Sequence, residues 1–93
     1  MRLDKYLKVA RIIKRRTVAN TICASGRVKL NGKVAKPSSE IKIGDIIEVG
    51  FGSGNVKVEV QEIREAVKRT EVSELYRIIG GAKGDEVPEI DEE

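Results

Sequence analysis

Histidine and tryptophan are absent from this sequence, cysteine occurs once, and the only aromatic residues are Tyr6, Phe51 and Tyr76. A single cysteine cannot form an internal disulfide, which fits a reducing compartment. Cys23 also has no histidine to activate it or to share a metal ion, so we expect it in the core. The scarcity of aromatic residues argues against the stacking platforms with which RRM-like and OB-like domains bind single strands.

Long apolar runs are missing as well, so the sequence predicts no membrane-spanning helix. The N-terminus is basic but has neither a continuous apolar segment nor a small-residue cleavage site, so no signal peptide is expected. We therefore expect a cytoplasmic protein. The 93 residues are expected to form one domain, and a domain of this size buries roughly 65% of its unfolded surface.

Charge is distributed unevenly, although the net charge is only +3. Residues 1–50 hold 12 Lys/Arg against 4 Asp/Glu, a net charge of +8, whereas residues 51–93 hold 6 against 11, a net charge of −5. This division predicts a face that binds nucleic-acid phosphates, followed by an acidic appendage. Asp4 is the only acidic residue before Glu40. The candidate RNA-binding residues are Arg2, Lys5, Lys8, Arg11, Lys14, Arg15, Arg16, Arg27, Lys29 and Lys36.

Two short helices are predicted in the basic half of the chain. From Arg2 to about Ile13, apolar side chains repeat at three- and four-residue spacing, with basic residues on the opposite face. The segment 14–16 is expected to separate the helices. Thr17 is a suitable N-cap for a second helix, from Val18 to Ala24 or Ser25, and Gly26 can adopt the left-handed conformation that ends it.

The rest of the sequence favours short strands joined by turns. Asn31-Gly32 is a strong signal for a two-residue hairpin, because both turn positions need positive φ. Alternating valines predict a half-buried strand from Val56 to about Ile63, after a hairpin loop over Gly50–Gly54. The other strands expected are Val28–Leu30, Val34–Ala35 and Ile46–Val49.

A short C-terminal helix is expected from Glu71 to about Ile79, because apolar residues recur there on one face and Thr70 can cap it. The predicted fold class is therefore α+β, with two N-terminal helices packed on a small, mainly antiparallel sheet, and a short C-terminal helix. Residues 1–80 form the expected domain. Residues 81–93, which are rich in acidic side chains and lack aromatic ones, are expected to form a disordered tail.

The order of these pieces resembles the small RNA-binding domain named after ribosomal protein S four. The resemblance is carried by Thr17-Val18-Ala19-Asn20, Gly26-Arg27-Val28-Lys29-Leu30-Asn31-Gly32, Lys36-Pro37-Ser38 and Gly44-Asp45. It implies that the two helices and the loop after them form an RNA-binding surface, which rests on a small β-sheet.

Residues 1–16 and the later FG…V.V segment further resemble the stand-alone bacterial proteins called RqcP or YabO, relatives of the fifteen-kilodalton heat-shock protein. The resemblance implies a non-enzymatic factor that binds obstructed large ribosomal subunits through rRNA and peptidyl-tRNA. It also implies that the protein and RqcH together add C-terminal alanines to stalled nascent chains. Arg2 and Arg16 match the RNA-contacting arginines of the family, and Asp4 matches an acid that orients RNA or a partner. A monomer without cofactor or metal ion is expected.

Other interpretations stay open at this point. A heat-shock-type factor that binds or recycles large subunits carrying nascent chains would share these features, as would a generic protein for structured RNA. An RNA-modifying enzyme is disfavoured by the short chain and the missing cofactor loop. A ubiquitin-like carrier, suggested by Gly80-Gly81, is disfavoured because twelve residues follow the glycines. Asp4 also suits the helix dipole as a simple first-turn acid, and Tyr6 is expected in the core.

Overall fold

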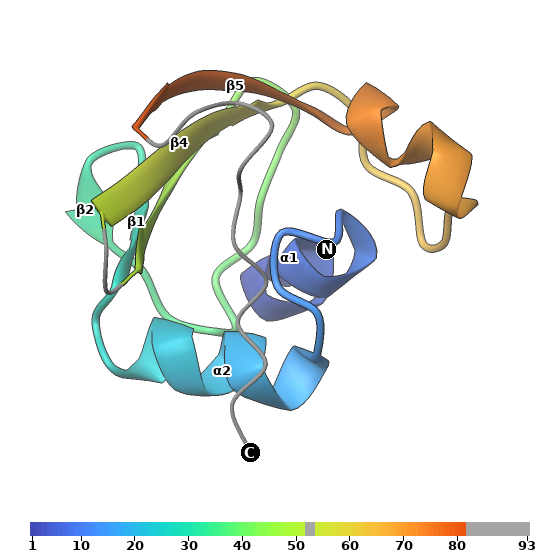
Figure 1. Cartoon of the computed structure of the whole chain (residues 1–93). Coiled ribbons are helices and arrows are strands. Elements are labelled where there is room, and N and C mark those ends of the chain that lie inside the picture. The colour runs from blue at the N-terminus through green and yellow to red at the C-terminus, as the bar shows by residue number, and fades with distance from the viewer. Residues whose placement is uncertain (52–53, 82–93) are drawn as a thin grey trace.

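The computed structural model describes residues 1–51 and 54–81. Two helices lie on one side of a five-stranded sheet, which curves over them in Figure 1. The strands follow the order β2-β1-β3-β4-β5, and all neighbouring pairs are antiparallel. The elements are α1 (Leu3–Val9), α2 (Arg16–Ala24), β1 (Val28–Leu30), β2 (Lys33–Val34), β3 (Ile46–Phe51), β4 (Gly54–Val60), the 3-10 helix η1 (Arg69–Glu74) and β5 (Tyr76–Gly81).

The α+β class is confirmed, and so are the two N-terminal helices on an antiparallel sheet. The predicted hairpin turn is also confirmed, because Asn31 and Gly32 have φ of 53° and 86°. The Asn31 side chain strengthens this turn, since it donates to Asp45 and accepts from the backbone N–H of Ile46. The expected loop over Gly50–Gly54 is shorter than predicted, because β3 continues to Phe51 and β4 begins at Gly54.

The first helix ends earlier than the predicted boundary at Ile13. Arg11, with φ of 56°, adopts the left-handed conformation directly after the C-cap Ala10. Its N–H bonds the carbonyl of Lys8, and the N–H of Ile12 bonds the carbonyl of Leu7, which together make a complete Schellman motif. Glycine usually occupies this position, and a side chain there costs about 1 kcal/mol. The turn redirects the chain so that Ile12 becomes fully buried.

The second helix begins at Arg16, so the prediction of Thr17 as its N-cap is wrong. Arg15 occupies the N-cap position in an extended conformation, and its side chain makes no capping hydrogen bond. Thr17 instead lies in the first turn, where its carbonyl accepts a hydrogen bond from the Thr21 hydroxyl. The helix therefore gains one more basic residue than expected, and Arg16 projects from its first turn.

The predicted C-terminal helix from Glu71 to Ile79 is confirmed only at its start, where residues up to Glu74 lie in a 3-10 helix, and it is wrong beyond that point. Residues 69–74 form η1, and residues 76–81 form β5, which pairs with β4 along the sheet edge. Pairing opposes Val58 to Ile78 and Glu59 to Arg77, and the Arg77 guanidinium lies 2.7 Å from the Glu59 carboxylate. Strand β4 thus provides a pairing partner for residues 76–81, which the local sequence pattern does not reveal. The expected disordered tail lies outside the described residues, apart from Gly81, which ends β5.

A single hydrophobic core fills the space between the helices and the inner face of the sheet. Val56, Val58 and Val60 of β4 point into it, while Lys57 between them is exposed. Tyr6 is fully buried, and its hydroxyl donates to the backbone carbonyl of Leu75 at 2.6 Å. Cys23 is buried as predicted. Its burial, helped by the negative charge of Asp4, raises the pKa of the thiol to about 12.

Candidate nucleic-acid interface

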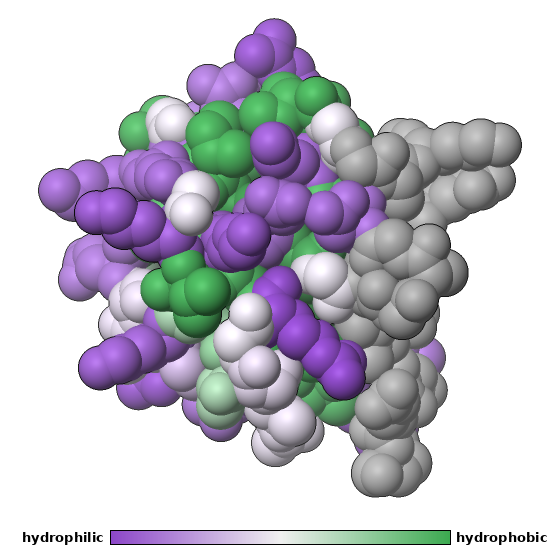
Figure 2. All heavy atoms as spheres, turned by 90° about the vertical axis from the view of Figure 1, so that its left-hand side faces the viewer, coloured by the Kyte–Doolittle hydropathy of each residue, from purple (hydrophilic) through white to green (hydrophobic). Residues whose placement is uncertain are grey.

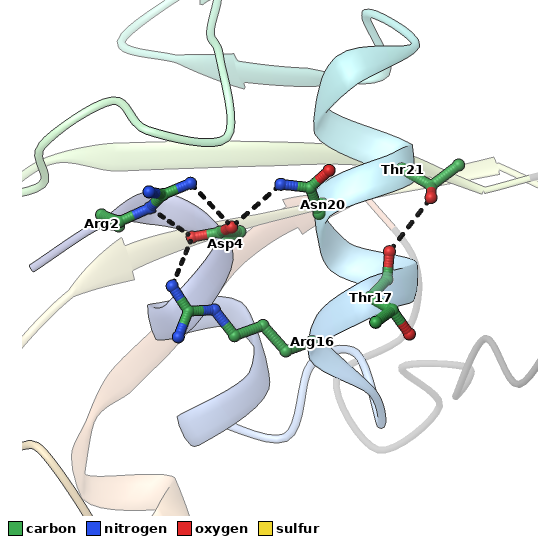
Figure 3. A pocket seen from close by; sticks show the side chains of 6 residues that line it. All are labelled: Arg2, Asp4, Arg16, Thr17, Asn20 and Thr21. Carbon is green, nitrogen blue, oxygen red and sulfur yellow. Dashed lines mark hydrogen bonds and ion pairs between the residues drawn. The ribbon is translucent and has the colours of Figure 1, made fainter.

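A buried carboxylate organises the surface where α1 and α2 meet. Asp4 is 1% exposed, yet it is surrounded by polar side chains from α2 and from the residue that precedes α1. Arg2 approaches it with two nitrogens, Nε at 3.2 Å from Oδ1 and Nη2 at 3.2 Å from Oδ2. Arg16 Nη2 lies 3.6 Å from Oδ1, and Asn20 Nδ2 donates to Oδ2 at 3.2 Å. Figure 3 shows all three side chains converging on the carboxylate.

The electrostatics of this cluster keep Asp4 ionised. Burial by itself raises the pKa of a carboxyl, because the charged form loses its water. Here the hydrogen bonds from Asn20 and Arg2 and the positive charges of Arg16 and Arg2 outweigh burial, so the pKa of Asp4 lies below its ordinary value of 3.8. The carboxylate cancels only one of the two guanidinium charges, so the cluster has a net positive charge.

The backbone holds Arg2 and Asp4 in place at the start of α1. Arg2 is in an extended conformation and forms an isolated β-bridge with Glu40. The N–H groups of Leu3 and Asp4 bond the carbonyls of Ser39 and Pro37. The loop after β2 therefore provides acceptors for helix N–H groups that would otherwise lack partners. Lys36 begins this loop, so the structure places it next to the N-terminus of α1.

Arg16 and Asn20 reach Asp4 together because they are four residues apart on α2. The same exposed face carries Thr17 and Thr21, while Ala19, Ile22 and Cys23 face the core. An open depression of about 480 Å³ lies over the cluster, and it is lined by Arg2, Asp4, Arg16, Thr17, Asn20 and Thr21. The arginine side chains are 50% and 48% exposed, so each retains donors for an external anion.

Sequence reasoning identified Arg2, Asp4 and Arg16 but gave Asn20 no role. The structure makes Asn20 the third donor to the buried carboxylate. An ionised carboxylate can accept hydrogen bonds but cannot donate them, so the amide nitrogen of Asn20 faces Asp4 and the amide oxygen faces away. The four-residue spacing from Arg16 was the available signal, although it becomes informative only once Asp4 is known to lie opposite that face.

The other candidate residues of α1 and the turn after it lie elsewhere. Lys5 pairs with Glu65, and this contact lowers the pKa of the Glu65 carboxyl. Lys8 and Arg11, near the C-terminal end of α1, line a second depression together with Glu65, Ala66 and Val67. Lys14 and Arg15 are exposed in the segment between the helices. Basic residues therefore lie at both ends of α1, with Arg2 at its start and Lys8 and Arg11 at its C-terminal end.

Arg27 and Lys29 belong to a separate surface on the sheet. They line a shallow depression with Glu48, Gly50 and Asn55, and the β1–β3 register sets Lys29 opposite Glu48. Figure 2 shows the side of the molecule where β1 and β2 lie, with hydrophobic spots set among hydrophilic side chains. The Glu48 carboxylate reduces the positive potential around Lys29.

Within the described residues, no group of three or more His, Cys, Asp or Glu side chains could hold a metal ion. In the same part of the chain, none of the helices has the length and apolarity needed to cross a membrane.

Comparison with known proteins identifies the family of the chain. Residues 1–47, which contain both helices and the first hairpin, match the S4 domain family. The chain is 45% identical over 86 residues to the RQC P-site tRNA stabilizing factor of Streptococcus pneumoniae R6, covering 92% of this chain and 98% of the relative. It is 47% identical over 79 residues to the factor of that name in Bacillus subtilis 168, covering 85% and 92%.

Among solved structures, the trimeric heat shock protein 15 of Vibrio cholerae superimposes with a TM-score of 0.79 at 34% identity, covering 85% of this chain and 81% of that chain. The fold, the basic helix pair and these matches define a non-enzymatic RNA-binding protein of the S4-domain class. Within that class, the chain belongs to the family of RQC P-site tRNA stabilizing factors.

Proposed function

We propose that this protein acts in bacterial ribosome-associated quality control. In this role it binds obstructed large ribosomal subunits through rRNA and peptidyl-tRNA, and supports the RqcH-dependent alanine tailing of stalled nascent chains. The names and identities of the relatives support the pathway. The proposal places the protein in the cytoplasm and treats residues 1–80 as a monomeric RNA-binding domain.

The observation that carries the proposal is the pair of half-exposed guanidinium groups held beside the buried Asp4. A guanidinium presents its donors in a planar fork that matches a phosphate. Fixing both arginines before binding reduces the side-chain entropy lost on contact with RNA. Structured RNA is recognised mainly through phosphates, 2′-hydroxyls and shape, which a rigid cationic surface can follow.

The first test is co-sedimentation of the protein with isolated large subunits, with and without peptidyl-tRNA, across a salt series. Binding that is tight only with peptidyl-tRNA supports the proposal. Equal and weak binding to any RNA contradicts it and leaves a generic RNA-binding protein.

Arg16→Ala tests the site itself. Loss of one phosphate contact should weaken binding about tenfold near 0.1 M salt, and should lower the slope of log K against log salt by about one. Alanine tailing should fall with it. The matched control is Lys57→Ala, which removes one positive charge from the outer face of the sheet. If both variants bind alike, the helix surface has no special role.

A second candidate function is a heat-shock-type factor that binds or recycles large subunits carrying nascent chains. The similarity to heat shock protein 15 supports this alternative. Pull-down on stalled large subunits separates the two functions, because recovery of RqcH with the protein is expected only for the quality-control factor.

A further inference from the structure

Arg11 occupies a backbone position that usually requires glycine. Its φ of 56° lies in the left-handed region, at the residue that follows the C-cap of α1. Both hydrogen bonds of the Schellman motif are made, at 3.0 Å from Arg11 to Lys8 and at 3.0 Å from Ile12 to Leu7. The turn is therefore well formed, and a glycine would make it without the crowding that a Cβ causes.

Within the described residues, no interaction of the Arg11 side chain offsets the energetic cost of this crowding. The side chain is exposed, and no hydrogen bond or ion pair joins it to residues 1–51 or 54–81. Its acidic neighbour Glu65 is already paired with Lys5. Lys8 and Arg11 therefore add two positive charges to this depression, beside a Lys5–Glu65 pair whose charges cancel.

We infer that Arg11 and Lys8 form a second phosphate-binding site for structured RNA, at the opposite end of α1 from Arg2 and Asp4. Strained positions concentrate where a side chain serves binding rather than the fold. The seven residues of α1 span about 10 Å, so the two sites contact different phosphates of one RNA. Both basic groups also lie near the helix C-terminus, where the helix dipole favours cations.

This inference rests on the proposed function, because the phosphates belong to the RNA that the Asp4 cluster binds. The deciding variant is Arg11→Gly. It should raise the melting temperature by several degrees, because the left-handed turn loses its strain. It should also weaken binding to large subunits about tenfold near 0.1 M salt and lower the salt slope by about one.

Three further variants separate the possible causes. Asparagine tolerates the left-handed conformation better than arginine does. Arg11→Asn should therefore weaken binding as Arg11→Gly does, and should raise the melting temperature by a smaller amount. Arg11→Ala keeps the strain and removes the charge, so only binding should fall. Lys57→Ala controls for the loss of one positive charge.

The outcomes distinguish this site from the proposed function. If Arg16→Ala weakens binding but Arg11→Gly binds like wild type or like Lys57→Ala, the second site is refuted and the proposed function stands. If neither variant weakens binding, the proposed function itself fails. A lower melting temperature for Arg11→Gly would refute the strain argument. Loss of a protein partner with RNA binding unchanged would show that Arg11 contacts protein instead.

Discussion

Replacing Asp4 with Asn tests whether an ionised carboxylate holds the two arginines. The change keeps the shape of the side chain but removes the charge that faces Arg2 and Arg16. A hydrogen bond to a charged group contributes about 1.5–3 kcal/mol, and the cluster contains three such contacts from Arg2 and Asn20. That sum is an upper bound, because the half-exposed arginines regain water when the carboxylate is lost. We expect a loss of about 2 kcal/mol near pH 7.

The pH dependence of this loss identifies the charged form as the cause. Because the pKa of Asp4 is lowered in the folded protein, its stabilising contribution is present above its ordinary value of 3.8. That contribution disappears as the pH falls through the folded-state pKa. The difference in unfolding free energy between the wild type and Asp4→Asn should therefore be constant above about pH 5 and shrink below about pH 3.8.

Urea unfolding followed by far-ultraviolet circular dichroism measures this difference at each pH. Other carboxyl groups titrate in both proteins, so their effects cancel in the comparison. A difference that is the same near pH 7 and near pH 3 would refute the argument, because a neutral Asp4 would then stabilise the fold as well as a charged one.

Two further predictions concern the core. Tyr6→Phe should lower the unfolding free energy by about 1 kcal/mol in urea, because one buried hydrogen bond is lost while the Leu75 carbonyl keeps the N–H groups of Gln61 and Glu62 as donors; an unchanged midpoint would contradict this role for the hydroxyl. Cys23, whose thiol pKa is raised to about 12, should resist alkylation by iodoacetamide near pH 8 in the folded protein and react once urea unfolds it; rapid labelling of the folded protein would contradict its burial.

The parts of the fold that the sequence predicts well are those set by local chemistry. Asn31-Gly32 accepts positive φ at both positions, and the alternating valines of β4 place every second side chain in the core. The end of α1 was missed because Ala10 and Ile13 also continue the helical repeat. Only the Schellman turn at Arg11, an unusual residue for that position, explains why Ile13 is buried without being helical.

The C-terminal segment shows a different limit of local patterns. The spacing of Val72, Leu75, Tyr76 and Ile79 fits one helical face, yet the edge of β4 offers backbone partners that stabilise a strand instead. Pairing between distant segments has no signal in a short window of sequence.

Resemblance to a family identified Arg2, Asp4 and Arg16, whereas charge counting alone treated all basic residues alike. The structure divides those residues among both ends of α1, the segment between the helices, the loop of Lys36 and the sheet. Their grouping depends on how α1 and α2 pack, which composition cannot predict. Asn20 became visible only through that packing.

The hydrogen bond from Tyr6 to Leu75 joins residues 69 positions apart, which has a consequence for folding order. Helix α1 is synthesised first, and its Tyr6 hydroxyl lacks the Leu75 carbonyl as an acceptor until nearly the whole domain has been synthesised. Contacts of such long sequence separation form late and slow the folding of small domains. The candidate RNA-binding surface at the start of α1 therefore gains this support only when Leu75 has reached Tyr6, and shortening the chain before Leu75 would loosen a surface built from its first residues.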